Sequence, residues 1–357
     1  MPPTVLIAGG GTGGHLFPGI AVARALIASV GARVSFVGTA AGLEVRVLPR
    51  EQLELDVIRS AGLKGKSLAA LARGLGLLPL SAVDAWRVIS RRRPDVVVGV
   101  GGYSSGPVVL LAALRGIPTL LMEQNATPGL ANRLLAPVVR AAAVTYEETA
   151  RHFGPKAFVS GNPVRAEFFA RAATPSPAGA PVRVLVFGGS QGARAINAAM
   201  VEAAPELARL APPVAITHQT GERDVEMVRE GYRRAGLEAR VEPFLFAMDH
   251  EMAAADLAVC RSGATTLAEL TAAGLPAILV PLPGATDDHQ HRNAVVLAAK
   301  AAAEIVDQRN LGMLASRVAA LAADPARRAR MAEAARTLAR PDAAAVIAAR
   351  VLELAGG

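Results

Sequence analysis

The sequence predicts an α/β protein of two similar domains, each built on a parallel β-sheet. The chain has 357 residues, about twice the length of a typical single domain. Short β-branched runs alternate with Ala- and Leu-rich helical stretches, and unbroken apolar runs of this kind are typical of strands covered on both faces. The expected strands are Thr4–Ala8, Val34–Val37, Asp95–Val100, Thr119–Glu123, Ala142–Val144, Val182–Phe187, Val214–Thr217, Leu257–Cys260 and Ala277–Val280.

The two halves of the chain repeat the same order of motifs. A strand that starts at Thr4 and ends in glycines opens the first half, and a strand through Val184 that ends in Gly-Gly-Ser-Gln-Gly opens the second. Two further motifs recur, an Asp-led apolar run and a Gly-x-Pro tripeptide: Asp95 and Gly116 in the first half, Asp256 and Gly274 in the second. This repetition predicts two domains instead of one large sheet, with the boundary near residues 161–165.

The chain is basic and poor in aromatic residues. Lys and Arg number 38 against 30 for Asp and Glu, and the net charge of +8 favours an anionic partner, unless it is only an ordinary solvated surface. Aromatic residues make up 4%, which argues against stacking on single-stranded nucleic acid, and no nucleic-acid partner is expected. Cys260 is the single cysteine, so no intramolecular disulfide is expected. We expect no signal peptide, and no apolar run reaches the roughly 20 residues of a membrane span, which predicts a soluble cytoplasmic protein.

A glycine-rich segment, Gly9–His15 (the first glycine loop), follows the first expected strand. Thr12, Gly13 and Gly14 lie directly before a helical stretch, where backbone N–H groups approach an anion closely and the helix N-terminus favours negative charge. The loop also fits the dinucleotide pattern G-x-G-x-x-G. The ribose-binding acid expected about 20 residues later is missing, because the next acid is Glu44. A nicotinamide-dependent oxidoreductase is therefore the less favoured alternative.

Two more glycine loops follow expected strands. The second glycine loop is Gly101–Pro107, and the third is Gly188–Gly192, which offers amides and the hydroxyl of Ser190 to a diphosphate. Because ligands of open α/β sheets bind beyond the carboxyl ends of the strands, we expect the loops to converge on a cleft between the domains. The alternative is that each set of glycines only makes a tight turn.

Six motifs stand in order along the chain: Gly11-Thr-Gly-Gly-His-x-x-Pro18, Gly101-Gly-Tyr-x-Ser-Gly-Pro107, Glu123-Gln-Asn125, Gly161-Asn-Pro-Val-Arg165, Gly188-Gly-Ser-Gln-Gly-Ala-Arg194 and Cys260-Arg-Ser-Gly-Ala264. Together they resemble the MurG family of peptidoglycan N-acetylglucosaminyltransferases over essentially the whole chain. The resemblance implies the GT-B fold, two Rossmann-like domains with parallel sheets facing across an interdomain cleft, and a last helix that crosses back onto the first domain. The expected domains are residues 1–163 plus 341–357, which bind the acceptor and the membrane, and residues 164–340, which bind UDP-GlcNAc.

The resemblance implies an inverting transfer of GlcNAc from UDP-GlcNAc to lipid I (undecaprenyl-pyrophosphoryl-MurNAc-pentapeptide). The product would be lipid II for peptidoglycan, and hence for cell-wall biogenesis, cell shape and division. No cofactor and no metal are expected, because the chain contains no Asp-x-Asp motif. Backbone amides, a helix N-terminus and arginine would stabilise the leaving UDP. A GT-B transferase with a different lipid acceptor, or a nucleotide-sugar binder without activity, are the alternatives.

By the same resemblance, the donor contacts lie in the glycine loops and around two later helices. Glu269 matches a glutamate that accepts both ribose hydroxyls, with an ordinary solvated helix glutamate as the alternative. Gln290 matches a glutamine near the GlcNAc hydroxyls, and His289 is able to share that role because the register of this loop is open by one residue. The other expected contacts are Thr12, Gly13, Gly14, Asn125, Arg165, Gly189 and Ser190 (the diphosphate cradle), Gln191, Gly192, Leu245 (whose backbone would receive uracil), Ala264, Thr265, Thr266, Leu267 and Ala268.

Inversion by one displacement needs a base that takes the proton of the acceptor hydroxyl. His15, in the first glycine loop, is the favoured candidate, and Glu123 is its competitor. A histidine in such a loop is as often a structural hydrogen-bonding group, so the choice stays open. Asn125 is expected to contact a sugar or the acceptor, or to form the turn before Pro128.

A leucine-rich basic stretch predicts a membrane-facing surface. Between residues 63 and 93 leucines alternate with Lys and Arg, and the single tryptophan lies among them. This composition suits an anionic lipid interface, with a core helix that has a solvated basic face as the alternative. The resemblance places the family's membrane patch here, and its expected residues are Leu75, Leu78, Trp86 and Arg87. The expected location is peripheral, on the cytoplasmic face of the inner membrane, and the expected partners are UDP-GlcNAc, lipid I, the anionic membrane surface and other cell-wall synthesis proteins.

Overall fold

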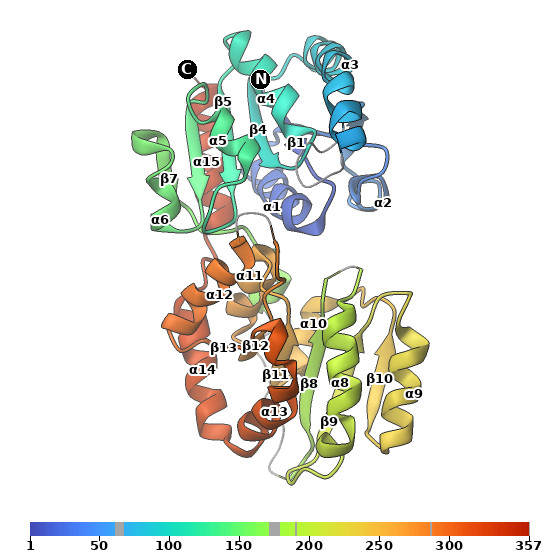
Figure 1. Ribbon diagram of the computed structural model, residues 1–357. Helices are drawn as coiled ribbons and strands as arrows, with labels where there is room; N and C mark the ends of the chain where they lie inside the picture. Colours follow the sequence, from blue (N-terminus) through green and yellow to red (C-terminus); the bar gives the residue numbers. More distant parts are fainter. Residues whose placement is uncertain (61–67, 171–178, 190, 286–287, 357) are drawn as a thin grey trace. The chain divides into compact units, whose positions relative to one another are not determined.

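The computed structural model describes residues 1–60, 68–170, 179–189, 191–285 and 288–356, with the backbone alone for 68–75. The chain divides into two compact units, Met1–Arg165 with Arg340–Gly357, and Ala166–Ala339 (Figure 1). Each unit is a parallel sheet with helices on both faces, which confirms the predicted α/β fold of two similar domains.

The first unit holds a seven-stranded parallel sheet in the order β3-β2-β1-β4-β5-β6-β7. The order of strands along the chain reverses between β1 and β4, and the carboxyl ends of strands at such a switch point are where open α/β sheets bind ligands. The first and second glycine loops follow these two strands. The strands are β1 (Thr4–Gly9), β2 (Arg33–Gly38), β3 (Glu54–Val57), β4 (Val96–Gly101), β5 (Thr119–Glu123), β6 (Ala141–Val144) and β7 (Ala157–Val159).

Two hydrophobic cores cover the two faces of this sheet. Val5 and Ile7 pack toward α1 (Gly13–Val30) and α15 (Ala343–Ala355), which contact each other, whereas Leu6 and Ala8 pack toward the opposite core. This alternation is the two-residue period of a strand. The opposite core includes α3 (Leu68–Arg92), α4 (Ser105–Leu114) and α5 (Leu130–Leu135); α2 (Glu44–Val47), α6 (Glu147–Ala150) and a 3-10 turn (Gly154–Lys156) complete the unit.

Among the described helices, α1 alone is long and apolar enough to cross a membrane by length and composition. Leu16, Ile20 and Leu26 of this helix are almost completely buried, and they belong to the core that α1 forms with the sheet and α15. A helix that packs in this way is typical of a protein core.

The second unit holds a six-stranded parallel sheet in the order β10-β9-β8-β11-β12-β13. Its switch point lies between β8 and β11, and the third glycine loop follows β8. The strands are β8 (Val182–Phe187), β9 (Val214–Gln219), β10 (Ala239–Glu242), β11 (Leu257–Cys260), β12 (Ala277–Leu279) and β13 (Ala303–Ile305). The helices are α7 (Glu167–Ala170), α8 (Arg194–Leu207), α9 (Val225–Ala235), α10 (Met248–Ala254), α11 (Ala264–Ala273), α12 (His289–Ala299), a 3-10 segment (Gln308–Met313), α13 (Leu314–Ala323) and α14 (Pro325–Thr337).

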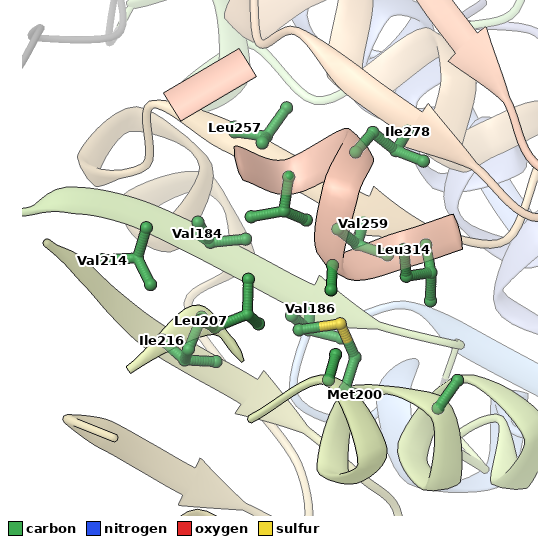
Figure 2. Packing of buried hydrophobic residues seen from close by; sticks show 14 of the residues in the cluster. Val184, Val186, Met200, Leu207, Val214, Ile216, Leu257, Val259, Ile278 and Leu314 are labelled. Carbon is green, nitrogen blue, oxygen red and sulfur yellow. The ribbon is translucent and has the colours of Figure 1, made fainter. Parts of the chain in front are cut away.

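The core of the second unit fills the space between one face of its sheet and helices α8, α9 and α13. Figure 2 shows valines of β8 beside side chains of β9 and β11, with residues of α8 and α13 packed against them. Val184, Val186 and Met200 are each at most 1% exposed. Burial of this apolar surface stabilises the sheet and holds the strand ends in place for the loops that follow them.

Nine strands were predicted, and the structure confirms all nine with small shifts of their ends. Four described strands were not predicted: β3, β7, β10 and β13. Each of them is an edge strand of its sheet. Edge strands are short and are less covered than central ones, and they therefore lack the continuous apolar run that identified the others.

Candidate active site

The first two glycine loops pack against each other at the switch point of the first sheet. Gly9, Gly10 and Gly11 all have positive φ, and the Gly10 N–H donates to the carbonyl of Gly101 over 3.2 Å. A Cβ at Gly9 would lie 2.2 Å from the Gly101 carbonyl oxygen, so this close backbone approach requires glycine. Thr12 and Gly14 are exposed beyond this contact, at the start of α1.

The Glu44 carboxylate is buried beneath the first glycine loop and anchors it. It accepts hydrogen bonds from the Gly11 N–H (2.7 Å) and from the Thr39 N–H (2.8 Å). A Cβ at Gly10, Gly38 or Gly42 would lie within 2.7 Å of its side chain, so these glycines make the space that it fills. The carboxylate takes up one loop amide and puts negative charge under the loop, where a dinucleotide site would present amides to a pyrophosphate. This geometry does not support the nicotinamide alternative.

His15 lies in the first turn of α1, with its ring oriented by Gln124. The imidazole Nδ1 is 3.3 Å from Gln124 Oε1, and Gln124 Nε2 donates to the Val100 carbonyl over 3.1 Å. Because the Gln124 amide nitrogen is turned toward Val100, its oxygen faces His15, and the neutral imidazole then carries its proton on Nδ1. Nε2 is therefore the ring nitrogen with the lone pair that a general base needs.

Glu123 is also buried, and four N–H groups surround its carboxylate. Oε1 accepts from the backbone N–H (3.0 Å) and the side-chain amide (3.2 Å) of Asn125. Oε2 accepts from the Gly129 N–H (3.0 Å) and from the Asn132 side chain (2.8 Å). Both oxygens thus act as acceptors that hold the loop after β5, and the Asn125 side chain is part of that loop structure. This arrangement favours a structural role for Glu123 over that of a base.

Arg165 belongs to the first unit and lies beside α1. Its guanidinium carbon is 5.1 Å from the centroid of the Phe17 ring, which is a cation–π contact. A Cβ at Gly13 would lie 3.0 Å from the same ring, so Gly13 and Arg165 are both neighbours of Phe17. The structure therefore places a positive charge near the first glycine loop.

The third glycine loop connects β8 to α8 in the second unit. Gly189 and Gly192 have positive φ, and the Gly192 N–H donates to the Gly189 carbonyl over 2.9 Å, which makes a tight turn. Gly189 and Gln191 are exposed, and α8 begins at Arg194. Ser190, the expected diphosphate contact, lies outside the described residues. The turn ends at a helix N-terminus, as anion-binding loops do.

A glutamine at the end of β9 joins this loop to the segment that carries Leu245. Gln219 Nε2 donates to the Gly189 carbonyl (2.9 Å), and Gln219 Oε1 accepts from the Leu245 N–H (2.8 Å). Leu245 is buried, and the rings of Phe244 and Phe246 on either side of it are exposed and meet edge to face, with centroids 4.9 Å apart. The N–H of Leu245 is thus engaged by Gln219 in this structure.

The remaining expected donor residues gather at the start of α11 and α12. Ala264, Thr265 and Leu267 are buried, whereas Thr266, Ala268 and Glu269 are partly exposed. Leu267 is 1% exposed, so its side chain belongs to the hydrophobic core.

Hydrogen bonds link the first turn of α12 to its neighbours. The Ser262 hydroxyl donates to the Gln290 carbonyl (2.8 Å), and Gln290 Oε1 accepts from the Leu282 N–H (3.0 Å). His289 is partly buried at the start of the same helix. Arg261 directly follows β11, and its guanidinium donates to the carbonyl of Val280 (3.0 Å), directly after β12, so it links the ends of these two strands; burial lowers its pKa. Within the described residues, no group of three or more His, Cys, Asp or Glu side chains is placed to hold a metal ion.

Comparisons with known proteins identify the family. The descriptions "Glycosyltransferase family 28 N-terminal domain" and "Glycosyltransferase family 28 C-terminal domain" match residues 5–144 and 183–347. A UDP-N-acetylglucosamine–N-acetylmuramyl-(pentapeptide) pyrophosphoryl-undecaprenol N-acetylglucosamine transferase of Anaeromyxobacter dehalogenans is 49% identical over 354 residues, which cover 98% of this chain and 92% of the relative. The crystal structure of Acinetobacter baumannii MurG has a TM-score of 0.78 and 31% identity, and the match covers 99% of this chain and 100% of that one. The chain belongs to the MurG family.

More distant structures share the GT-B fold of this MurG-family chain. The glycosyltransferase of kitacinnamycin has a TM-score of 0.72 at 19% identity, with 98% of this chain and 100% of that chain covered. At this identity the likeness concerns the fold alone. The family membership confirms the resemblance stated from the six sequence motifs.

In this MurG-family chain, the predicted site residues fall into two sets, one in each unit. Thr12, Gly13, Gly14, His15, Glu123, Asn125 and Arg165 belong to the first unit, and Gly189, Gln191, Gly192, Leu245, Ala264–Glu269 and Gln290 belong to the second. No role was predicted for Gln124 or Gln219, and Glu44 was considered only as an acid that lies too far along the chain to bind the ribose of a dinucleotide. Gln219 and Gln124 both lie at or just after the carboxyl end of a predicted strand, and this position was a usable indication of a site residue.

The predicted membrane residues of the MurG-family chain are exposed where the structure describes them. Leu78 and Trp86 on α3 are 42% and 52% exposed, and Arg87 is exposed as well. The Arg115 guanidinium lies 4.4 Å from the centroid of the Trp86 ring, and the neighbouring Leu114 is 71% exposed. Leu75 lies on α3, in the part whose side chains the structure does not describe. Apolar and cationic side chains thus alternate over α3 and the end of α4.

Proposed function

We propose that this chain transfers GlcNAc from UDP-GlcNAc to lipid I, with inversion at the anomeric carbon, and so forms lipid II. The observation that carries the proposal is the placement of amide-rich loops at the switch point of each parallel sheet. It is supported by near full-length identity of 49% to a transferase whose name gives this donor and a muramyl-pyrophosphoryl acceptor. We assign the donor to the second unit and the lipid-linked acceptor to the first.

In the proposed donor site, the third glycine loop and the N-terminus of α8 receive the diphosphate. The exposed Gly189 and Gln191 lie at the turn, and the partial positive charge of the helix end favours the anion. Glu269 accepts the ribose hydroxyls, the segment around Leu245 receives uracil, and Gln290 binds the GlcNAc hydroxyls. Because Leu245 already donates its N–H to Gln219, its carbonyl is the group that would accept from the uracil ring.

His15 is the proposed base. The Gln124 contact holds the imidazole in the tautomer with its lone pair on Nε2, whereas both oxygens of Glu123 already accept from N–H groups. The acceptor hydroxyl oxygen would bond to the anomeric carbon while the bond from that carbon to the diphosphate oxygen breaks; the hydroxyl proton moves to His15, and the electron pair of the broken bond leaves with UDP. Arg165 would supply positive charge near the first glycine loop.

We propose that the reaction needs no metal cofactor, since backbone amides, helix N-termini and arginine are sufficient to stabilise the leaving diphosphate. Turnover that is unchanged in excess EDTA is the expected result. Loss of turnover in EDTA with recovery on addition of Mg²⁺ would contradict this part of the proposal.

We further propose that the chain acts at the cytoplasmic face of the inner membrane and binds anionic lipid through the surface made by Leu78, Trp86, Arg87, Leu114 and Arg115. Exposed apolar side chains beside arginines suit insertion at the headgroup level with attraction to anionic lipid. Co-sedimentation with phosphatidylglycerol vesicles should exceed that with phosphatidylcholine vesicles and should fall with salt. Equal binding to both kinds of vesicle would contradict the assignment.

The direct test of the function incubates the purified chain with UDP-GlcNAc and a short-chain lipid I analogue, and it scores the disaccharide product and the configuration of its new linkage. The expected product is the β-linked GlcNAc–MurNAc disaccharide. A parallel reaction with other lipid-linked sugars tests the alternative of a different acceptor. Product from another acceptor, with none from the lipid I analogue, would contradict the proposal.

A further inference from the structure

We propose that Gln219 is a positioning residue that makes recognition of the nucleobase and recognition of the diphosphate depend on each other. The inference rests on the proposed function, because it concerns how the second unit binds UDP. Gln219 is 2% exposed, at the carboxyl end of β9. Its side chain connects two stretches of backbone that come from different parts of the chain, one in the third glycine loop and one at Leu245.

The chemistry of this bridge requires an amide. The group at one end is a carbonyl oxygen, that of Gly189, and the group at the other end is an N–H, that of Leu245. Only a side chain with both a donor and an acceptor on one short fork satisfies the two together. Glutamate offers no donor to the carbonyl, methionine offers neither group with comparable strength, and asparagine is one methylene shorter.

Two glycines beside the bridge show close backbone approaches. A Cβ at Gly192 would lie 1.8 Å from the Thr220 carbonyl oxygen, and a Cβ at Gly221 would lie 2.4 Å from the Gln191 carbonyl oxygen. The third glycine loop and the turn after β9 are thus in close backbone contact, and Gln219 extends this contact to the segment that bears Phe244 and Phe246. Backbone hydrogen bonds from the Thr220 N–H to the Glu242 carbonyl (3.0 Å) and from the Gly221 N–H to the Pro243 carbonyl (3.1 Å) lead toward the same segment, and Gln219 adds a side-chain hydrogen bond to each side.

A ligand with a base and a diphosphate joined covalently benefits from this fixed distance. When both subsites are held at the spacing of the ligand, the second contact forms without further loss of freedom. When the bridge is removed, each subsite keeps its own groups and the backbone contacts remain, but the spacing of the two subsites is held less firmly because the side chain that hydrogen-bonds to both is gone. We therefore expect UDP, which spans both subsites, to lose more affinity than UMP, which has one phosphate fewer.

The test compares wild type with Gln219→Met, Gln219→Glu and the control Thr220→Val. Thr220 is the next residue and is equally buried, and its hydroxyl hydrogen-bonds to the carbonyls of Gly221 (3.0 Å) and Glu242 (3.4 Å) but not to Gly189 or Leu245. The measurements are the KM of UDP-GlcNAc, kcat, and the inhibition constants of UDP and UMP. Loss of two buried hydrogen bonds predicts that Gln219→Met raises the KM and the UDP constant about tenfold, the UMP constant less than about threefold, and changes kcat little.

Gln219→Glu should be more damaging to UDP than Gln219→Met, because it places a carboxylate oxygen opposite the Gly189 carbonyl, and Thr220→Val should leave the ratio of UDP to UMP constants unchanged. Circular dichroism and thermal melting check that each variant is folded, and Gln219→Asn replaces Gln219→Met if that variant does not fold. Equal losses for UDP and UMP, or no loss for either, would overturn the inference and leave the proposed function intact. Failure of the wild-type chain to bind UDP would overturn the proposed function as well.

Discussion

Replacing the Glu123 carboxylate by an amide, Glu123→Gln, separates its structural role from a catalytic one. In the structure two N–H groups donate to each carboxylate oxygen. The amide keeps one acceptor oxygen and turns its NH₂ group toward the other two donors, which lose their acceptor. Each buried N–H without an acceptor costs about 1–3 kcal/mol, so the free energy of unfolding of the first unit should fall by about 4 kcal/mol.

For a unit of this size, that loss corresponds to a fall in melting temperature of roughly 10 °C, which calorimetry resolves. The control is Glu147→Gln, an exposed glutamate on α6, for which a change within about 0.5 kcal/mol is expected. Glu123→Gln should keep a measurable kcat, because the proposed base, His15, is unchanged. A Glu123→Gln chain with unchanged stability and turnover reduced by a factor of about 1000 or more would refute the reasoning and make Glu123 the base.

Four further predictions concern the two units. His15→Gln should lower kcat by a factor of about 100–10,000 while the inhibition constant of UDP stays within a factor of about two; near-normal kcat would remove His15 as base. Gln124→Met should lower kcat by about 3- to 10-fold, because it releases the His15 ring, and should leave the KM of the donor unchanged. An unchanged kcat would show that the contact between Gln124 and His15 does not contribute to turnover. Glu269→Ala should raise the KM of UDP-GlcNAc by roughly tenfold or more, with a smaller effect on kcat, and an unchanged KM would take Glu269 out of the donor site. Burial lowers the pKa of His218 to about 3, so on acidification the unfolded chain is protonated at this histidine before the folded chain is. The contribution of neutral His218 to the free energy of unfolding is fully present above about pH 6.5. The free energy of unfolding should therefore fall by about 2 kcal/mol between pH 7 and pH 5. Denaturant unfolding at the two pH values measures this, and His218→Gln should remove most of the difference; the same pH dependence in both chains would contradict it.

The central part of each sheet could be predicted from the sequence, because a strand buried on both faces must be apolar at every position. Val96–Val98 and Val184–Val186 meet that condition. The edge strands could not be predicted in this way, because a strand with only one neighbouring strand does not need to be apolar at every position. Glu54–Val57 has acidic residues at two of its four positions and still forms β3 by pairing with β2.

The glycine loops were also predictable, since a positive φ such as that of Gly189 or Gly192 restricts the residue type locally. The side-chain contacts that organise these loops were not. Glu44 reaches Gly11 across 33 positions, and Gln219 reaches Gly189 across 30. Such pairings arise from the order of strands in the sheet, and a local pattern in one sequence contains no information on them.

The roles of polar residues were predictable only as alternatives. The buried network in which Tyr232 and Asn197 hydrogen-bond to the two ring nitrogens of His218 (2.7 and 3.1 Å) was not predicted, because nothing near His218 in the sequence indicates which helices cover it. For the base the sequence left His15 and Glu123 open, and the N–H groups that surround the Glu123 carboxylate favour a structural role for that residue.

The central claim is that the second unit binds the nucleotide through the loop between β8 and α8. A crystal structure of the chain with UDP tests it most directly. The account predicts a diphosphate that accepts hydrogen bonds from backbone amides of Gly188–Gly192, with the ribose hydroxyls on Glu269. UDP bound instead to the Gly9–His15 loop of the first unit would contradict the account.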